Sequence, residues 1–161
     1  MAGPFLLSKR IRVCYNKLSK AKGGDFVHII LCLDDHNGML FHHRRQSRDR
    51  VVIQEILESW KGKRIWISPF SFALFQGNEE NVLVDESFLE TAKEGDCCFV
   101  EDKSLNPYKD AIESFTVYRW NRHYPADLVL DVDLNSEWHL VSQKDFPGYS
   151  HATITKEVYK R

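Results

Sequence analysis

Runs of apolar residues, separated by polar turns, divide most of the chain into short strands and helices. Residues 26–33 (FVHIILCL) are nearly all apolar, as in a central strand that is buried on both faces of a sheet. From Val52 to Trp60, apolar side chains recur at spacings of three and four, which predicts an amphipathic helix after Ser47. Residues 64–68 (RIWIS) predict a second buried strand.

The other predicted elements are shorter. Short helices are predicted at 68–75, 85–93 and 105–112. Strands are predicted at 82–84, 97–100, 115–120, 128–134, 138–142 and 152–159. Strands alternate with helices as far as residue 112, whereas the last strands leave no room for helices between them. This order predicts a three-layer α/β sandwich with a mostly parallel central sheet and antiparallel C-terminal strands.

Length and composition set the class of protein. The chain has 161 residues, of which 43% are hydrophobic and 28% charged, which indicates one soluble globular domain with its own core. No apolar run approaches the ~20 residues of a membrane-spanning helix, so no membrane association is expected. The four cysteines form no C-x-x-C pair, which favours a reduced, cytoplasmic protein over a disulfide-linked one.

Charge is distributed unevenly along the chain. Residues 1–22 carry six Lys and Arg and no acid, so the other 139 residues carry 16 basic and 23 acidic side chains. An acidic body repels phosphate backbones, which disfavours nucleic acid as a partner. We therefore expect a basic N-terminal extension over residues 1–24 and a single domain over 25–161. A short helix docked on the domain and a transit peptide are the alternatives for the extension.

The densest polar stretch follows the first strand, at the place where open α/β sheets bind ligands. Asn37 lies in the turn after this strand, and the other candidate substrate-binding residues follow it: Arg44, Arg45, Gln46 and Arg48. Arginines around a helix N-terminus favour a phosphate or a carboxylate, because the helix dipole adds to their positive charge. The alternative is a solvated surface that pairs with acidic residues of the body.

Asp49 falls in the first turn of the predicted helix and has two interpretations. A carboxylate there stabilises the helix dipole by about 0.3–1 kcal/mol. Alternatively, it faces a cleft and binds a nitrogen heterocycle, in which case the neighbouring arginines keep it ionised.

Other motifs are weaker. Residues 119–127 (RWNRHYPAD) interleave aromatic and basic side chains, which could stack a flat ring or could simply be a strand end and a Tyr-Pro turn. The seven histidines show no spacing typical of a zinc site, so no metal is expected. Serine-hydrolase, P-loop and dinucleotide glycine signatures are absent from the sequence.

The order of the elements resembles dihydrofolate reductase over nearly all of residues 26–160. The features that match, in chain order, are an apolar strand running into Asp34-x-x-Asn37-Gly38, Asp49, GKRIWI at 62–67, the strand at 99–100, the strand at 115–120, YPAD at 124–127, EWHLVS at 137–142 and a last strand ending at Tyr159. The resemblance implies a dihydrofolate reductase-like fold, NADPH as cofactor, and Asp49 as the catalytic residue that binds a pteridine-like or other heterocyclic substrate.

The resemblance also places Ser68, Ser71 and Glu101 at the cofactor. The family has Gly-Arg-x-Thr and Gly-Gly there, whereas this chain has Ser-Pro-Phe-Ser at 68–71 and Glu101-Asp102. Segment 38–49 is also similar to small bacterial proteins labelled ribonuclease Z, but the His-x-His-x-Asp-His cluster that would hold two zinc ions is absent.

Three functions stay open on the sequence. The first is a divergent NADPH-dependent reductase, which the missing glycines oppose. The second is a non-catalytic domain that binds an anionic small molecule on the same fold. The third is an RNA-associated protein or nuclease, which the missing metal ligands oppose. A small-molecule ligand is the expected partner, and the oligomeric state is not indicated.

Deletion of residues 1–24 tests the predicted boundary. A chain that begins at residue 25 should unfold with unaltered thermal stability, because an extension contributes nothing to the core. Melting curves of the truncated and full chains measure this. Aggregation of the truncated chain would show instead that the extension packs on the domain.

Overall fold

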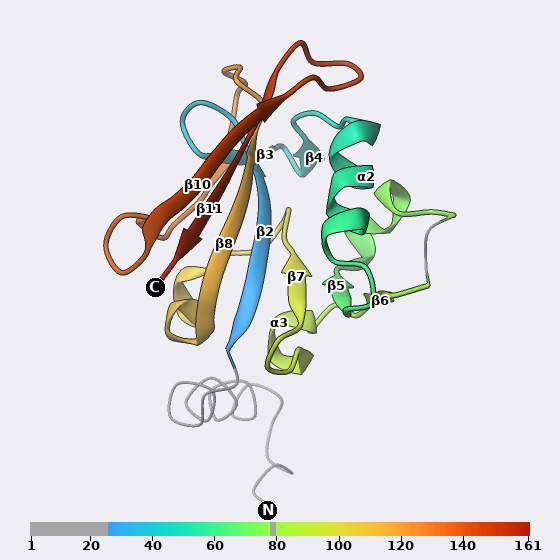
Figure 1. Cartoon of the computed structure of the whole chain (residues 1–161), viewed down its shortest axis with the longest axis vertical. Helices are drawn as coiled ribbons and strands as arrows, with labels where there is room; N and C mark the ends of the chain where they lie inside the picture. The colour runs from blue at the N-terminus through green and yellow to red at the C-terminus, as the bar shows by residue number, and fades with distance from the viewer. Residues whose placement is uncertain (1–25, 78–79) are drawn as a thin grey trace, which may run out of the picture.

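A computed structural model describes residues 26–77 and 80–161, and the predicted extension at 1–24 lies outside these residues. A seven-stranded sheet forms the centre of the fold, in the order β10-β11-β8-β2-β7-β5-β6 (Figure 1). Its strands are β2 (Val27–Leu33), β5 (Ile65–Ile67), β6 (Val82–Val84), β7 (Cys97–Phe99), β8 (Ile112–Arg119), β10 (His139–Phe146) and β11 (Ile154–Lys160).

Strand β2 lies inside the sheet because its side chains are apolar on both faces. It pairs in parallel with β8 on one side and with β7 on the other, and β5 and β6 continue the parallel part. The last two strands, β10 and β11, form an antiparallel hairpin that joins β8. The predicted fold class, a mostly parallel sheet with antiparallel C-terminal strands, is therefore confirmed.

Alternate residues of β2 enter two separate cores, as the two-residue period of a strand requires. Ile29 and Leu31 pack on one face with Phe88 of helix α3 (Phe88–Thr91). Ile30 packs on the other face with Ile53 and with the rest of the apolar stripe of helix α2 (Arg50–Ser59). The sheet is thus the middle layer of three.

The structure departs from the predicted elements in their lengths. The short helices at 68–75 and 105–112 are 3-10 helices, η1 (Pro69–Leu74) and η2 (Asn106–Ala111), and α3 covers only four residues. Of the strand predicted at 128–134, only β9 (Leu128–Val129) pairs. The apolar residues that follow, such as Leu130 and Leu134, are buried in the core without joining the sheet, so their pattern was that of a packed loop.

A second, three-stranded sheet follows the end of β2. Strand β3 (Gly38–Phe41) pairs with β4 (Arg44–Arg45) and with β9. The turn between β3 and β4 consists of His42 and His43, both with positive φ. In the described part of the chain, no helix is long and apolar enough to cross a membrane.

Truncation of Ile30 tests the position of β2. Ile30 is fully buried between the sheet and α2, so Ile30→Ala should lower the free energy of unfolding by about 2–5 kcal/mol. Val141, at 54% exposure on the edge strand β10, is the control. Val141→Ala should change the free energy of unfolding by less than about 0.5 kcal/mol. Urea unfolding of the two variants measures these changes. Equal losses of unfolding free energy in Ile30→Ala and Val141→Ala would contradict the central position of β2.

Candidate functional site

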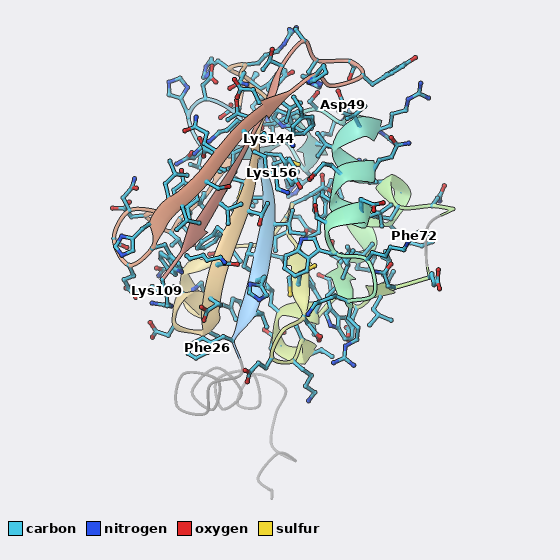
Figure 2. The ribbon with its side chains drawn as sticks, viewed as in Figure 1. Phe26, Asp49, Phe72, Lys109, Lys144 and Lys156 are labelled. Atoms are coloured by element: carbon cyan, nitrogen blue, oxygen red, sulfur yellow. The ribbon has the colours of Figure 1, made fainter. Side chains whose placement is uncertain are left out.

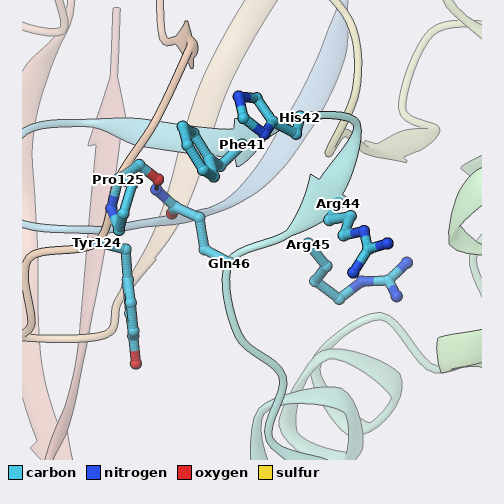
Figure 3. A pocket seen from close by; sticks show the side chains of 7 residues that line it. All are labelled: Phe41, His42, Arg44, Arg45, Gln46, Tyr124 and Pro125. Carbon is cyan, nitrogen blue, oxygen red and sulfur yellow. Dashed lines mark hydrogen bonds between the residues drawn. The ribbon is translucent and has the colours of Figure 1, made fainter.

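A cavity of about 500 Å³ opens where β3 and β4 meet the segment that follows β8 (Figure 3). The side chains that line it are Phe41, His42, Arg44, Arg45, Gln46, Tyr124 and Pro125. The rings of Phe41 and His42 are stacked, with centroids 3.8 Å apart. In Figure 3, the side chain of Gln46 points toward Pro125, whereas those of Arg44 and Arg45 extend away from Pro125. Three of the five predicted substrate-binding residues therefore lie together here.

The buried carboxylate of Asp34 connects the turn after β2 to the loop that carries Tyr124. It follows β2 and accepts hydrogen bonds from the backbone N–H groups of His36 (2.8 Å), Gly38 (2.7 Å) and Tyr124 (3.1 Å). Burial by itself raises the pKa of Asp34, but these hydrogen bonds outweigh burial and hold the pKa below its usual value. The ionised carboxylate thus fixes the turn after β2 against the loop that carries Tyr124.

Gln46 lines the cavity and is held in place by the hydrogen bonds of its amide. Its Nε2 donates to Asp34 and to the carbonyl oxygen of Pro125, both at 3.2 Å, which sets the orientation of the amide. Its Oε1 is buried and receives no hydrogen bond from any described residue. Gly38 makes room for this amide, because a Cβ at position 38 would lie 2.6 Å from Nε2. An unpaired buried acceptor costs about 1–3 kcal/mol, so a donor that reached this oxygen would be stabilised.

The two arginines of β4 have different surroundings. Arg45 donates to both oxygens of Glu101, at 2.7 and 2.8 Å, and to the carbonyl oxygen of Phe70 at 3.1 Å. The hydroxyl of Ser71 donates to the same carboxylate at 2.8 Å. The side chain of Arg44 is exposed and forms no ion pair or hydrogen bond with the described residues. The charge of Arg45 is therefore neutralised within the protein, whereas that of Arg44 remains available to a ligand.

The residues expected at a dinucleotide do not fit one. Ser68 donates its hydroxyl proton to Asp102 at 3.1 Å, and Ser71 donates to Glu101, so neither hydroxyl is free for a phosphate. Residues 100–104 contain no glycine that would let a pyrophosphate approach the backbone. The carboxylates of Glu101 and Asp102 would repel its charge, and the nearby cation, Arg45, is already paired.

The other two predicted substrate-binding residues do not line the cavity. Asn37 takes a positive φ of 62° in the turn after β2, and its Oδ1 accepts a hydrogen bond from Arg119 at 2.5 Å. Arg48 is exposed on the segment before α2, and its carbonyl oxygen accepts from the hydroxyl of Ser150 at 3.1 Å. Their predicted contact with substrate stays a prediction.

Asp49 is the N-cap of α2, one residue before the helix and not in its first turn (Figure 2). Its side chain is fully buried, with 0% exposure. Its Oδ1 accepts from the N–H groups of Val51 and Tyr149, both at 2.9 Å, and its Oδ2 accepts from the N–H of Ser150 at 2.8 Å. The segment around Tyr149 thus covers the carboxylate, and a ligand would reach it only if that segment moved away.

These contacts keep Asp49 charged although it is buried. Burial by itself raises the pKa of this carboxyl, but the hydrogen bonds from Tyr149, His151, Ser150 and Val51 outweigh it and lower the pKa far below its usual range.

His151 is the partner of Asp49 that sequence reasoning missed. Its Nδ1 lies 2.9 Å from Oδ2 of Asp49, and its Nε2 lies 2.9 Å from Oγ of Ser47. The ring stacks on Trp120, with centroids 4.7 Å apart and planes at 24°. Asp49 and His151 are 102 residues apart, so no local pattern relates them. Tyr124 and Pro125, by contrast, lie in segment 119–127, whose interleaved aromatic and basic residues had indicated a possible binding surface.

A second cavity, of about 550 Å³, is lined by Leu40, His43, Phe70, Asp102, Asp127 and Leu128. It holds two carboxylates and no arginine, which makes it less suited to an anion. Within residues 26–77 and 80–161, no group of three or more His, Cys, Asp and Glu side chains could hold a metal ion.

Replacement of Asp49 tests the role of its charge in stability. Asp49→Asn should lower the free energy of unfolding at neutral pH by about 2–3 kcal/mol, because the amide NH₂ would face N–H donors. The native pKa of Asp49 lies below the unfolded value of 3.8, so its contribution is complete above about pH 5 and is lost as the pH falls through the acidic range. Urea unfolding from pH 7 to pH 3 should show the gap between wild type and variant narrowing. A gap that is constant with pH would contradict a charged, buried Asp49.

Comparisons with known proteins identify the fold but not a family. No protein-family model matches the sequence, and no curated protein sequence does. Among solved structures, the chain is similar to a dihydrofolate reductase from Enterococcus faecalis in complex with NADP(H) and RAB-propyl, at a TM-score of 0.62 and 10% identity. The match covers 84% of this chain and 96% of the reductase. The chain therefore has a dihydrofolate reductase-like fold, and the resemblance to proteins labelled ribonuclease Z finds no support.

Proposed function

We propose that this protein binds a small anionic molecule with a flat ring in the cavity between β3, β4 and the loop at Tyr124. The observation that carries the proposal is that two residues lining this one cavity have unpaired groups, the buried amide oxygen of Gln46 and the exposed guanidinium of Arg44. A hydrogen-bond donor on the ring would satisfy the amide, and a carboxylate or phosphate would pair with the arginine. The stacked rings of Phe41 and His42 and the ring of Tyr124 supply flat surfaces for the ligand.

The binding domain is preferred over the reductase for a physical reason. The solved reductase binds NADP(H) on a similar fold, which makes a reductase the second candidate. A fold does not determine chemistry, however, and the Arg45–Glu101 ion pair stands where the resemblance would put the pyrophosphate. A cytoplasmic location, inferred from the cysteine pattern, belongs to the same proposal.

Thermal unfolding of the full chain with folic acid tests the proposed site. Folic acid is a suitable probe because it joins a flat pteridine ring to two carboxylates. At 100 times its dissociation constant, a ligand adds ~2.7 kcal/mol of stability, which raises the melting temperature visibly. Arg44→Gln should weaken binding about tenfold or more by removing a charge-assisted hydrogen bond. Arg122→Gln is the matched control, since Arg122 is exposed and does not line the cavity.

NADPH in the same assay separates the two candidates. No shift is expected with NADPH, because Glu101 and Asp102 oppose its phosphates. A shift with NADPH but none with folic acid would favour the reductase over the binding domain. Equal effects of Arg44→Gln and Arg122→Gln on folic acid binding would place the ligand elsewhere.

A further inference from the structure

Ser47, His151 and Asp49 form one continuous chain of hydrogen bonds. Oγ of Ser47 lies 2.9 Å from Nε2 of His151, and Nδ1 of His151 lies 2.9 Å from Oδ2 of Asp49. These are the residue types, the order and the spacing by which a serine hydroxyl is activated in nucleophilic catalysis. Ser47 and Asp49 lie in the segment just before α2, and His151 lies in the loop between β10 and β11.

The surroundings of His151 select the tautomer that such a chain needs. Asp49 is a carboxylate that only accepts hydrogen bonds, so Nδ1 of a neutral His151 carries the proton and Nε2 carries the lone pair. The hydroxyl of Ser47 must then donate to Nε2. Stacking on the buried ring of Trp120 fixes the plane of the imidazole. His151 is thereby held in the form and orientation of a general base.

The three residues differ in their access to solvent in the way a nucleophile requires. Asp49 is fully buried and His151 is 5% exposed, whereas Ser47 is only half-buried. Ser47 also follows Gln46, which lines the cavity of about 500 Å³.

We propose that Ser47 is a nucleophile and His151 its general base, and that the protein hydrolyses small carboxylic esters. Oγ of Ser47 forms a bond to the carbonyl carbon as its proton moves to Nε2 of His151. The ester C–O bond then breaks, and the leaving alcohol takes that proton. Water, deprotonated by His151, attacks the acyl-serine and releases the carboxylic acid, which restores Ser47. Asp49 is a positioning residue that holds Nδ1–H.

This activity goes beyond the proposed binding function and does not depend on it. The sequence gives no sign of it, because the three residues lie outside any serine-hydrolase signature and are recognised by geometry alone.

A fluorophosphonate probe and p-nitrophenyl acetate test the proposal on the full chain. The probe should add one phosphonyl group, and peptide mass spectrometry should locate it on Ser47. Ser47→Ala should lose the label and at least about a hundredfold of the esterase rate, since the nucleophile is gone. Ser59→Ala is the matched control, because Ser59 is exposed at the other end of α2 and contacts Glu55 instead of a histidine. The control should keep both the label and the rate.

Circular dichroism of Ser47→Ala verifies that the variant is folded. If Ser47→Ala does not fold, the location of the label on the wild-type chain decides the proposal by itself. An unlabelled wild-type chain, a label on another residue, or an esterase rate unchanged in a folded Ser47→Ala variant would overturn it. Folic acid binding is measured separately, so failure of the binding site and failure of the nucleophile are distinguishable.

Discussion

The charge of Asp49, buried at the start of α2, is the constraint on which the arrangement around it depends. A buried carboxylate is tolerated only when hydrogen-bond donors surround it. Here the donors come from the first turn of α2 and from residues 149–151, so the charge joins the first helix to the last hairpin. Gly148 permits this, because a Cβ at that position would lie 2.6 Å from Oδ2 of Asp49. A side chain at position 148 would therefore push the loop away from the carboxylate.

A second ion pair, Arg45–Glu101, lies at the position where the resemblance would place a cofactor. At the end of β7, Glu101 and Arg45 satisfy each other, with Ser71 as a third partner. The charged groups at this edge of the sheet are therefore paired with one another and are not free to bind a ligand. In the neighbouring cavity, the side chains of Arg44 and Gln46 keep groups that no described residue satisfies, and the proposed ligand would bind there. The fold is similar to that of a dihydrofolate reductase, and a shared fold does not determine the chemistry of the side chains at this edge.

The sequence predicted what depends on local periodicity. Strand β2 and helix α2 follow from apolar spacing, and the turn at Asn37 follows from a residue that tolerates positive φ. Arg44, Arg45 and Gln46 could be placed at one site because parallel strands end on the same edge of a sheet. The pairing of Asp49 with His151 could not be predicted, since it depends on how a distant loop folds back. Nor could the length of β9, since burial alone does not tell a loop from a strand.

The central position of β2 has a consequence for how the chain folds. The first described strand needs β8 as its neighbour, and His28 meets Ser114 across 86 residues of intervening chain. Strands so far apart in the sequence pair slowly, because the intervening chain loses conformational entropy before the contacts between the strands stabilise the sheet. On a ribosome, β2 emerges long before β8, and the hairpin that carries His151 emerges after all the other described elements. A partly synthesised chain can therefore form α2 and part of the core, but the surroundings of Asp49 are completed only after residues 149–151 have emerged.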